Sequence, residues 1–584
     1  MHARHITSDS DYRTPFGAVQ LGGTVKLAID VWDEEPQGAE LRLWIGGNGE
    51  ALIPMEAEAC GDATRFSVDF MPRCAGIFWY TFKIRAADGS VWSYGAREEH
   101  AVGEGAFHYG ETPSFQITVY VPRKTQPTWY QQGVVYQIFP DRFSRGDDWR
   151  ERAETLEMPR EGPQRRLVED WDTPVSYERS EGGGIAAWDF YGGTLEGVRE
   201  KLGYLEALGI TAIYLNPIFE AASNHRYDTA DYTRIDPLLG DEESFRALCA
   251  DAEEHGISII LDGVFNHTGR DSRYFNAFGN YPDVGAAQSP ESPYHLWYKM
   301  EEDGSYSSWW GVADLPDIDE CNPDYRAFIC GENGIVRRWL RAGARGWRLD
   351  VADELPDPFI AEIKAAALAE RDDALVIGEV WEDATHKVAY NELRRYFEGE
   401  ELDGVMNYPL RAGILRYLTG EATATELADT LEQLIENYPP EALANCLNVL
   451  GTHDRMRLFT ILGGAPDKSE LTDEQRAGYR LSEGQASLAR SRLWLAALLQ
   501  MSLPGVPAST MATSWASRAT TTPTTARPCP GMRPTRIARP STATPSACAR
   551  PFPCWSTAAA SPLRQAMTSS GSGAAARRDA SACS

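Results

Sequence analysis

The sequence predicts an α/β protein built on a (β/α)₈ barrel, with a small β-sandwich before it and a subdomain inserted into it. Three observations predict this arrangement. Residues 1–125 contain short strands separated by turn residues. From Val134 onward, short apolar strands alternate with amphipathic helical segments, the pattern of parallel βα units. A stretch rich in Tyr, Trp, Gly and Asp, residues 267–321, interrupts the alternation and is too long for an ordinary loop.

The expected elements follow in order along the chain. The sandwich strands are expected at LRLWI, RFSVDF, GIFWYTFKIRA and SFQITVYV, and the linker VPRKTQPTWYQQ leads into the barrel domain, residues 126–507. The barrel strands are expected in GVVYQIFP, ITAIYLNPIF, GISIILDGVF, GARGWRLDV, ALVIGEVW and LNVLGTHD. Helices are expected in TLEGVREKLGYLEALG and FIAEIKAAALAER. This many parallel strands favours a barrel over an open sheet.

Composition limits the classes of partner. The 584 residues carry a formal net charge of −29, which disfavours nucleic acid and anionic membranes. The first residues lack the apolar core of a signal peptide, and no apolar run is long enough to span a bilayer. The ten cysteines form no CxxC pair. These features predict a cytoplasmic protein with reduced thiols and a neutral polar substrate.

Charged and polar residues gather where the expected barrel strands end, which is where barrel sites form. They are Asp262, Asn266 and His267 in LDGVFNH, Arg348 and Asp350 in GWRLD, Glu379 in IGEVW, and His453 and Asp454 in LGTHD. Several carboxylates in one layer repel one another unless they are protonated, paired or bound to something. A functional cluster is therefore favoured over ordinary salt bridges and helix caps. Carboxylates that flank a neutral polar substrate suit glycoside hydrolysis.

Four of these segments resemble a known family. DGVFNH, GWRLDVADE, IGEVW and LGTHD are similar, in order and spacing, to the four signature segments of the α-amylase family, glycoside hydrolase family 13. YQIFPDRF, GITAIYLNPIF and NHRYDTADY agree, and the resemblance runs from Val134 to Pro507. A sandwich followed by a barrel resembles the cyclomaltodextrinase, neopullulanase and maltogenic amylase branch. That branch usually reads MPKLN where residues 315–319 read LPDID. Cyclodextrins, linear maltodextrins and pullulan therefore stay equally open as substrates.

The resemblance implies a retaining α-glucan hydrolase that cleaves α-1,4-glucosidic bonds through a covalent glycosyl-enzyme. Asp350 would be the nucleophile, Glu379 the acid/base, and Asp454 a binder of sugar hydroxyls on the distorted ring. Arg348 would keep Asp350 ionised and oriented. Neighbouring carboxylates and a dry pocket would raise the pKa of Glu379. Retention implies that the carboxyls of Asp350 and Glu379 lie roughly 5–5.5 Å apart.

Other residues are weaker candidates for substrate binding, and each has core packing or structural bracing as its alternative. They are Tyr227, Asp262, His267, Trp309, Trp310 and His453. No cofactor is expected to be required. No His/Cys metal constellation and no Gly-rich phosphate loop is apparent in the sequence. Calcium stays open, with Asn266 as its candidate ligand. The sandwich is expected to bind glucan or to mediate a homodimer, and its sequence does not choose between them.

The tail, residues 508–584, differs from the rest in composition: it holds nine Arg and one Asp but no Glu, Lys, Tyr or Val. A disordered tail is one interpretation. A frameshift near Pro507 is favoured, because the codons of ASTMATS, read from their third bases, permit IYYGDE, which the family implies for the eighth strand. We therefore expect the last barrel strand and the C-terminal β-domain to be lost. The first and seventh strands would keep unpaired edges, and the chain would be unstable and poorly active.

Two alternative functions stay open. An α-glucan transglycosylase uses the same three carboxylates, and product analysis separates it from a hydrolase. An inactive carbohydrate-binding remnant would keep the barrel without turnover. The presence of Asp350, Glu379 and Asp454 argues against that second alternative.

Overall fold

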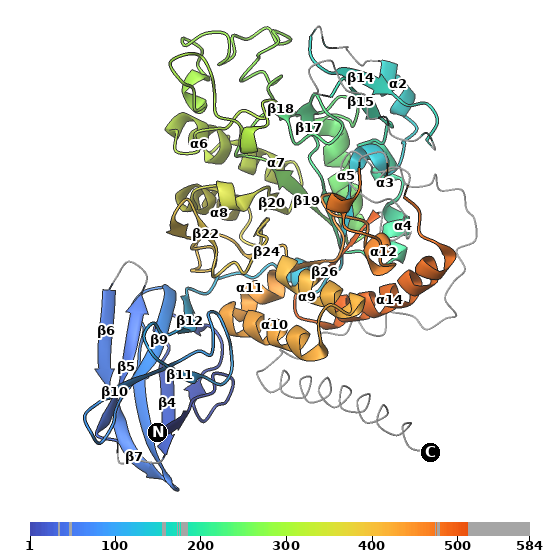
Figure 1. Ribbon diagram of the computed structural model, residues 1–584. Coiled ribbons are helices and arrows are strands. Elements are labelled where there is room, and N and C mark those ends of the chain that lie inside the picture. The colour runs from blue at the N-terminus through green and yellow to red at the C-terminus, as the bar shows by residue number, and fades with distance from the viewer. Residues whose placement is uncertain are drawn as a thin grey trace, which may run out of the picture.

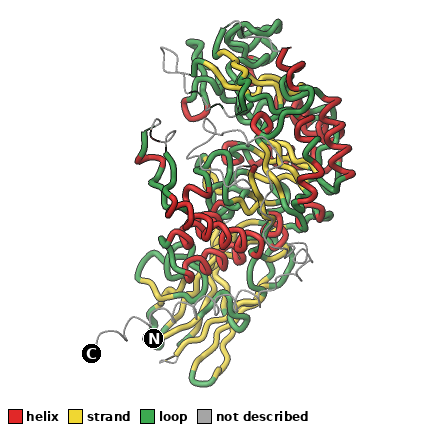
Figure 2. Tube along the Cα trace, turned by 90° about the vertical axis from the view of Figure 1, so that its right-hand side faces the viewer, coloured by secondary structure: helices red, strands yellow, loops and turns green. Residues whose placement is uncertain are grey.

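The computed structural model describes residues 1–32, 36–45, 49–154, 159, 161–171, 173, 176, 185–472, 475 and 479–511. A β-sandwich, blue in Figure 1, lies beside a larger α/β body formed by the rest of the described chain. Figure 2 shows the same division, with long strands at one end and the helices wrapped around the strands of the larger body. The fold class predicted from the sequence, a sandwich followed by a (β/α)₈ barrel, is confirmed.

The sandwich consists of two mainly antiparallel sheets that enclose one apolar core. The first sheet contains β1 (His2–Arg4), β2 (Arg13–Thr14), β4 (Val25–Trp32), β7 (Glu56–Cys60) and β8 (Ala63–Phe70). The second contains β3 (Val19–Gln20), β5 (Gly38–Ile45), β6 (Gly49–Pro54), β9 (Gly76–Arg85), β10 (Val91–Gly95), β11 (Ala106–His108) and β12 (Phe115–Tyr120). All four strands expected from the sequence are present as β5, β8, β9 and β12.

The larger body is built on one parallel sheet of eight strands among the described residues. In chain order these are β13 (Val135–Ile138), β16 (Ala212–Leu215), β19 (Ser258–Gly263), β20 (Gly346–Leu349), β21 (Leu375–Gly378), β24 (Gly404–Val405), β25 (Leu447–Val449) and β26 (Val506–Thr510). Each strand from β13 to β24 pairs with the next. A parallel bridge between Met406 and Leu447 joins the sixth strand to the seventh, so the sheet closes into a barrel.

The expected loss of the eighth strand is wrong. β26 pairs with β13, with Ala508 opposite Val135, and with β25, with Val506 opposite Leu447. The ladder is made of backbone hydrogen bonds, which do not depend on side-chain identity, and the side chains of Val506 and Ala508 are small enough to be buried in the barrel interior. The edges of the first and seventh strands are therefore paired. The instability of the chain was expected because these edges would be unpaired, so the structure removes the reason for expecting it. Residues 512–584, which contain most of the tail, lie outside the described residues.

Helices surround the barrel and cover its outer face (Figure 1). The main ones are α3 (Leu195–Arg199), α4 (Leu202–Ala207), α5 (Glu242–Glu254), α6 (Pro323–Cys330), α7 (Ile335–Arg341), α8 (Asp357–Glu370), α9 (Tyr408–Thr419), α10 (Ala424–Asn437), α11 (Pro440–Asn445), α12 (Leu458–Leu462) and α14 (Glu483–Ser502). The two expected helices are α3 with α4, and α8. The start of α10 is fixed by a capping box between Thr423 and Glu426. None of the described helices is both long and apolar enough for a membrane span.

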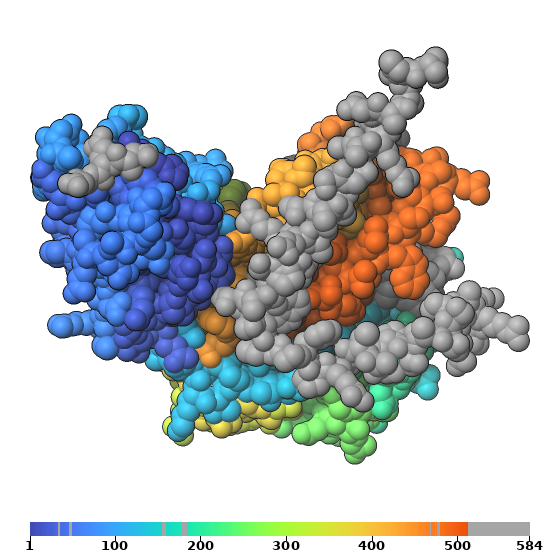
Figure 3. Space-filling model, turned by 90° about the horizontal axis from the view of Figure 1, so that it is seen from below, coloured from blue at the N-terminus to red at the C-terminus, as the bar shows by residue number. Residues whose placement is uncertain are grey.

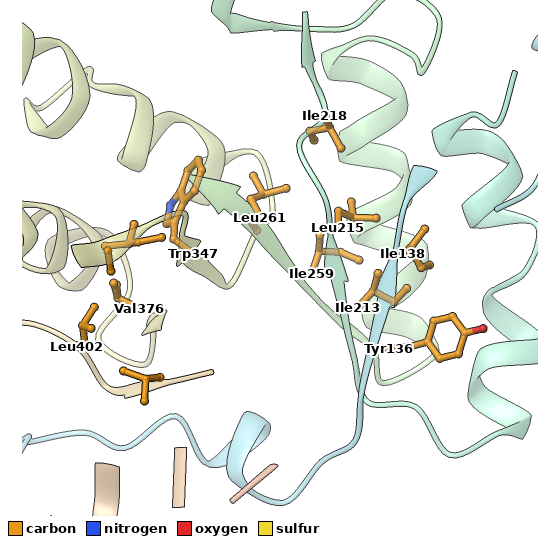
Figure 4. Close-up of a cluster of buried hydrophobic side chains, with 14 of the residues drawn as sticks. Tyr136, Ile138, Ile213, Leu215, Ile218, Ile259, Leu261, Trp347, Val376 and Leu402 are labelled. Carbon is orange, nitrogen blue, oxygen red and sulfur yellow. The ribbon is translucent and has the colours of Figure 1, made fainter. Parts of the chain in front are cut away.

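Alternation along each strand divides the barrel residues between two apolar clusters. Ile213, Leu215, Ile259, Leu261 and Trp347 point outward into the layer between strands and helices, as the close-up in Figure 4 shows. Their neighbours on the same strands, such as Tyr214 and Ile260, point into the barrel. This division decides which residues at the strand ends face the site.

The loops after the strands carry smaller elements. They are α2 (Trp149–Glu154), β14 (Gln164–Leu167), β15 (Ala187–Phe190), β17 (Phe219–Ala221), β18 (Thr229–Ile235), β22 (Val388–Ala389) and β23 (Glu392–Leu393), while α1 (Thr128–Gln131) precedes β13. The insertion predicted at residues 267–321 begins and ends with a bridge between His267 and Asp317. Between them lie the 3₁₀ turns His295–Trp297 and Trp309–Gly311. The domain boundaries drawn from the sequence stay predictions.

Polar contacts join the sandwich to the barrel. Arg13 of β2 forms a fully buried ion pair with Glu436 of α10, with Nη1 and Oε1 2.7 Å apart. Gln116 of β12 donates from Nε2 to Thr385 Oγ1 over 3.0 Å, and its Oε1 lies 2.5 Å from His386 Nε2. Through Gln116 the sandwich therefore contacts the loop that follows β21. Figure 3 shows the sandwich on one side of the molecule and the orange α12–α14 region on the other.

Candidate active site

Strand alternation places the charged side chains at one end of the barrel. In β20, Trp347 and Leu349 lie in the outer apolar layer, so Arg348 points inward, and Asp350 follows on the same side. In β19 the same rule turns Asp262 inward, and Glu379 follows the last residue of β21. All of these residues stand at the carboxyl ends of their strands, where barrel sites form.

Arg348 is the centre of the cluster. Its guanidinium is fully buried, and Nη1 donates to Asp262 Oδ1 over 2.6 Å and to Asp350 Oδ1 over 2.8 Å. Its Nη2 lies 2.7 Å from Glu379 Oε2, which also accepts from the Val351 amide. One cation therefore holds three buried carboxyl groups that come from three strands. The structure brings Asp262, Arg348, Asp350 and Glu379 together, as the sequence predicts.

The crowding of buried carboxyls shifts the pKa of Asp350. Burial raises the pKa of Asp350 well above its ordinary value; Arg348 lowers it, and the carboxylates of Glu379, Asp262 and Asp454 raise it further. Sequence reasoning expected Arg348 to keep Asp350 ionised, but a single guanidinium is shared among several carboxyls and cannot neutralise them all. Around Asp350, burial and the neighbouring carboxyls outweigh Arg348, so the net shift of its pKa is upward.

A second group of contacts centres on His453 and Tyr227. Their rings stack with centroids 5.1 Å apart and planes 9° apart. Nδ1 of His453 faces the side-chain amide nitrogens of Gln137 and Asn216, both at 3.0 Å. Two donors at Nδ1 assign the hydrogen to Nε2, which lies 3.2 Å from Asp454 Oδ1. Burial lowers the pKa of His453 to about 3, so the imidazole is neutral near pH 7.

Asp262 and His267, both expected to bind substrate, are occupied by protein partners. Besides Arg348, Asp262 accepts at Oδ2 from the hydroxyls of Tyr214 at 2.5 Å and Tyr227 at 2.9 Å. The Nε2 atom of His267 lies 3.1 Å from the Tyr227 carbonyl oxygen, while its Nδ1 has no hydrogen-bond partner in the described chain. Asp262 thus orients Tyr227 and Arg348, and His267 contacts the backbone of Tyr227. Any direct role in binding substrate stays a prediction.

The two tryptophans of the insertion differ in their surroundings. Trp309 is half-buried, with its ring 5.7 Å from that of His267. Trp310 is 83% exposed, and its Nε1 donates to Glu354 Oε1 over 3.2 Å. Packing therefore accounts for the position of Trp309 but not for that of Trp310.

A calcium site is poorly supported by the residues present. The Oδ1 atom of Asn266 is buried and has no hydrogen-bond partner among the described residues, as a ligand oxygen would. Ca²⁺ takes six to eight oxygens, yet the described chain brings no three His, Cys, Asp or Glu residues together in a way that could hold a metal. The described residues do not supply the carboxylates of such a site.

Several residues at the site were not singled out from the sequence. Gln137 and Asn216 are the polar residues inside the apolar strands YQIFP and YLNPIF, which was a usable signal. Trp381 follows Glu379 by two residues and donates from Nε1 to Glu379 Oε1 over 3.2 Å. Arg455 places its guanidinium carbon 3.6 Å from the centre of the Trp381 ring. No sequence signal pointed to that stacking, because it joins two separate strand ends.

A closed parallel barrel with buried carboxyls gathered on one guanidinium defines the class of (β/α)₈ barrel proteins that carry an acidic cluster at the carboxyl ends of their strands. Within that class the chain belongs to the α-amylase family, because residues 137–477 match the family model described as "Alpha amylase, catalytic domain". The family resemblance inferred from the signature segments is confirmed.

The chain is similar to several individual members of this family. An amylopullulanase of Thermoanaerobacterium saccharolyticum is 35% identical over 86% of this chain, but the match spans only 41% of that relative's length. A cyclomaltodextrinase of Geobacillus thermopakistaniensis is 35% identical over 59% of this chain and 53% of its own length. The solved structure of a type III pullulan hydrolase from Thermococcus kodakarensis superposes with a TM-score of 0.58 and 25% identity, covering 89% of this chain and 82% of the other.

Proposed function

We propose that this protein is a retaining α-glucan hydrolase that cleaves α-1,4-glucosidic bonds of maltodextrins, cyclodextrins or pullulan. The observation that carries the proposal is the buried ion cluster, in which Asp350 and Glu379 bind different nitrogens of the Arg348 guanidinium. A retaining mechanism needs two such carboxyls, one ionised and one protonated, facing one glycosidic bond. Membership of the α-amylase family, together with relatives named amylopullulanase, cyclomaltodextrinase and neopullulanase, supports the substrate class.

The proposed reaction has two steps. The carboxylate of Asp350 attacks the anomeric carbon while Glu379, as the general acid, gives a proton to the leaving oxygen. Glu379, now ionised, takes a proton from water as the water releases the sugar from Asp350. Arg348 and the Val351 amide hold the two carboxyls in place during both steps. Asp454 would bind hydroxyls of the ring under attack, beside Nε2 of His453.

The test compares Asp350→Asn with the unchanged chain on maltoheptaose. We expect turnover to fall at least about 10³-fold, since a neutral amide cannot form the glycosyl-enzyme. Measurement of the product anomer by proton NMR should show the α form first. Turnover by Asp350→Asn near that of the unchanged chain would overturn the mechanism. A first product of β configuration would do the same.

Product length separates hydrolysis from transglycosylation. Chromatography of an early time point gives only shorter sugars for a hydrolase and longer ones for a transglycosylase. Binding of maltodextrin without any turnover, in the unchanged chain, would favour the carbohydrate-binding alternative.

Location and assembly are proposed on narrower grounds. We infer that the protein acts in the cytoplasm; the related maltogenic amylase of Bacillus subtilis is named intracellular. The net charge of −29 supports a neutral glucan over nucleic acid or an anionic membrane as the partner. The sandwich as a glucan-binding or dimer-forming module stays a proposal, to be tested by sedimentation of the chain with and without residues 1–125.

A further inference from the structure

We propose that Arg455 is a positioning residue for Glu379 and acts through the indole ring of Trp381. The guanidinium of Arg455 fixes that ring where its N–H donates to the carboxyl proposed as the acid/base. The proposal rests on the proposed function, because it names what holds the proton donor of the same reaction in place.

One guanidinium contacts two aromatic rings beside the acid/base. The guanidinium carbon of Arg455 lies 3.6 Å from the centre of the Trp381 ring and 5.4 Å from the centre of the Tyr408 ring. The two rings are nearly parallel, with centroids 4.9 Å apart and planes 18° apart. A cation within about 6 Å of a ring centre is attracted to the ring face, and desolvation strengthens the attraction. Because Arg455 is half-buried, it holds Trp381 more firmly than a fully hydrated cation would.

Trp381 depends on such a contact for its orientation. The residue is 39% exposed, so core packing holds only part of its ring. It lies in a bend after β21, outside any helix or strand, where the backbone ladder does not fix it. Tyr408, by contrast, is buried at the start of α9. The mobile partner in this group of rings is therefore the one that touches Glu379.

The indole and the rest of the site bind different oxygens of Glu379. Trp381 Nε1 donates to Oε1 over 3.2 Å. Oε2 accepts from the Val351 amide over 3.2 Å and lies 2.7 Å from Nη2 of Arg348. Because Oε2 faces two donors, a protonated Glu379 carries its proton on Oε1. Trp381 therefore orients the oxygen that gives the proton to the leaving group.

The contact also joins two strand ends that carry proposed site carboxyls. Trp381 follows Glu379 by two residues after β21, and Arg455 follows Asp454 directly in the loop after β25. This position has a cost, because burial and then the charge of Arg455 lower the pKa of Arg411 to about 10. The attraction of Arg455 to the two rings opposes the repulsion between these guanidiniums.

A purely structural contact is the competing explanation, and the leaving group separates the two. A residue that positions the proton donor matters only when the leaving atom needs a proton. With α-maltosyl fluoride, the carboxylate of Asp350 forms its bond to the anomeric carbon as the C–F bond breaks. The electron pair departs with fluoride, which needs no proton. A structural contact affects both kinds of substrate equally, together with the melting temperature.

The experiment measures kcat/KM of the full chain on maltoheptaose and on α-maltosyl fluoride, because kcat/KM reports the first irreversible step. For Arg455→Ala we expect a fall of about tenfold on maltoheptaose and of less than about twofold on the fluoride. Arg455→Gln, which keeps most of the side-chain length without the charge, should behave in the same way and serves if the alanine variant does not fold. Arg455→Lys keeps a cation over the ring and should recover part of the loss.

Two further variants complete the comparison. Trp381→Phe keeps a ring but loses the donor to Oε1, so its loss should depend on the leaving group as that of Arg455→Ala does. The matched control is Arg150→Ala: the guanidinium carbon of Arg150 lies 4.5 Å from the centre of the Trp149 ring in α2, and its side chain is 68% exposed. Both kcat/KM values should stay unchanged there. Equal losses of Arg455→Gln on the two substrates, or no loss on maltoheptaose, would overturn the positioning role.

A second readout keeps the test separate from the proposed function. In the full chain labelled with fluorotryptophan, the fluorine NMR resonance that disappears in Trp381→Phe belongs to Trp381. Arg455→Gln should shift or broaden that resonance, and Arg150→Ala should leave it in place. An unmoved resonance in Arg455→Gln would overturn the positioning role. A shifted resonance in a chain that cleaves neither substrate would contradict the hydrolase proposal and leave the orientation of Trp381 by Arg455 standing.

Discussion

The guanidinium of Arg348 lies 2.8 Å from the carboxyl of Asp350, two residues further along the chain, and neither side chain has appreciable contact with solvent. The same guanidinium binds Asp262 and Glu379. The geometry of both candidate catalytic carboxyls therefore depends on one planar cation with two separate amino groups.

Arg348→Lys should impair catalysis although it keeps the charge. A lysine ammonium is a point charge and cannot hold three carboxyls on two fixed nitrogens. We expect kcat on maltoheptaose to fall about a hundredfold or more, as for loss of a fixed electrostatic group in an active site. Arg338→Lys on α7, where an exposed arginine pairs with Glu242, is the matched control and should change kcat little. A full kcat in Arg348→Lys would contradict the role given to the guanidinium.

Stability should fall in mild acid because of buried neutral histidines. Burial lowers the pKa of His5 and His453 to about 3 and that of His267 to about 4, against 6.5 in an unfolded chain. Below pH 6.5 the unfolded state binds protons that the folded state does not, so the free energy of unfolding decreases as pH falls from 6.5 toward 4. At pH 5 the loss is about 2 kcal/mol for each such histidine.

Urea unfolding at pH 7 and pH 5 measures that loss. His5 is far from the active site, hydrogen-bonded to the Ala28 carbonyl and the Tyr80 hydroxyl inside the sandwich. His5→Gln should make the difference between the two pH values smaller, whatever its effect at pH 7. His255→Gln, at an exposed position beside Glu206, serves as the control. An equal pH dependence in His5→Gln and the unchanged chain would disprove the assignment.

The ion pair between Arg13 and Glu436 should matter most when only one partner is removed. Both side chains are buried between the sandwich and α10. Arg13→Met leaves a buried carboxylate without its cation, and we expect a loss of about 3–5 kcal/mol in the free energy of unfolding. The double variant with Glu436→Leu should recover most of that loss. Equal stability of the single and double variants would show that the pair does not hold this interface.

Closure of the barrel should depend on one glutamine of α14. Gln500 Nε2 donates to the carbonyl of Asn448 in β25 over 2.6 Å and to that of Ala508 in β26 over 2.8 Å. Gln500→Leu removes both bonds, and we expect a loss of about 1–3 kcal/mol in the free energy of unfolding. Hydrogen exchange should speed up at β26 more than at β19. Gln485→Leu, at the exposed start of the same helix, gives the comparison.

Much of the architecture was predictable because it follows from periodicity. Apolar strands alternating with amphipathic segments predicted the barrel, and the two-residue period predicted that Arg348 and Asp350 share its inner face. The eighth strand was not predictable from composition, because Val506–Thr510 forms a ladder through its backbone while the sequence around it changes character. The hydrogen bonds that Trp310 and Tyr390 donate to the carboxylate of Glu354 were also missed. These contacts depend on how three loops from distant parts of the chain come together, and no local sequence pattern indicates such a contact.

The contact of Gln116 with Thr385 and His386 has a consequence for exchanging domains between relatives. A strand of the sandwich contacts the segment that leaves the barrel after Glu379, so a substitution on one side of this contact changes the packing on the other side. Exchanging the N-terminal module for that of a relative would therefore disturb the reaction centre unless the segment were transplanted with it. For a domain exchange, the sandwich and this barrel loop therefore form one unit.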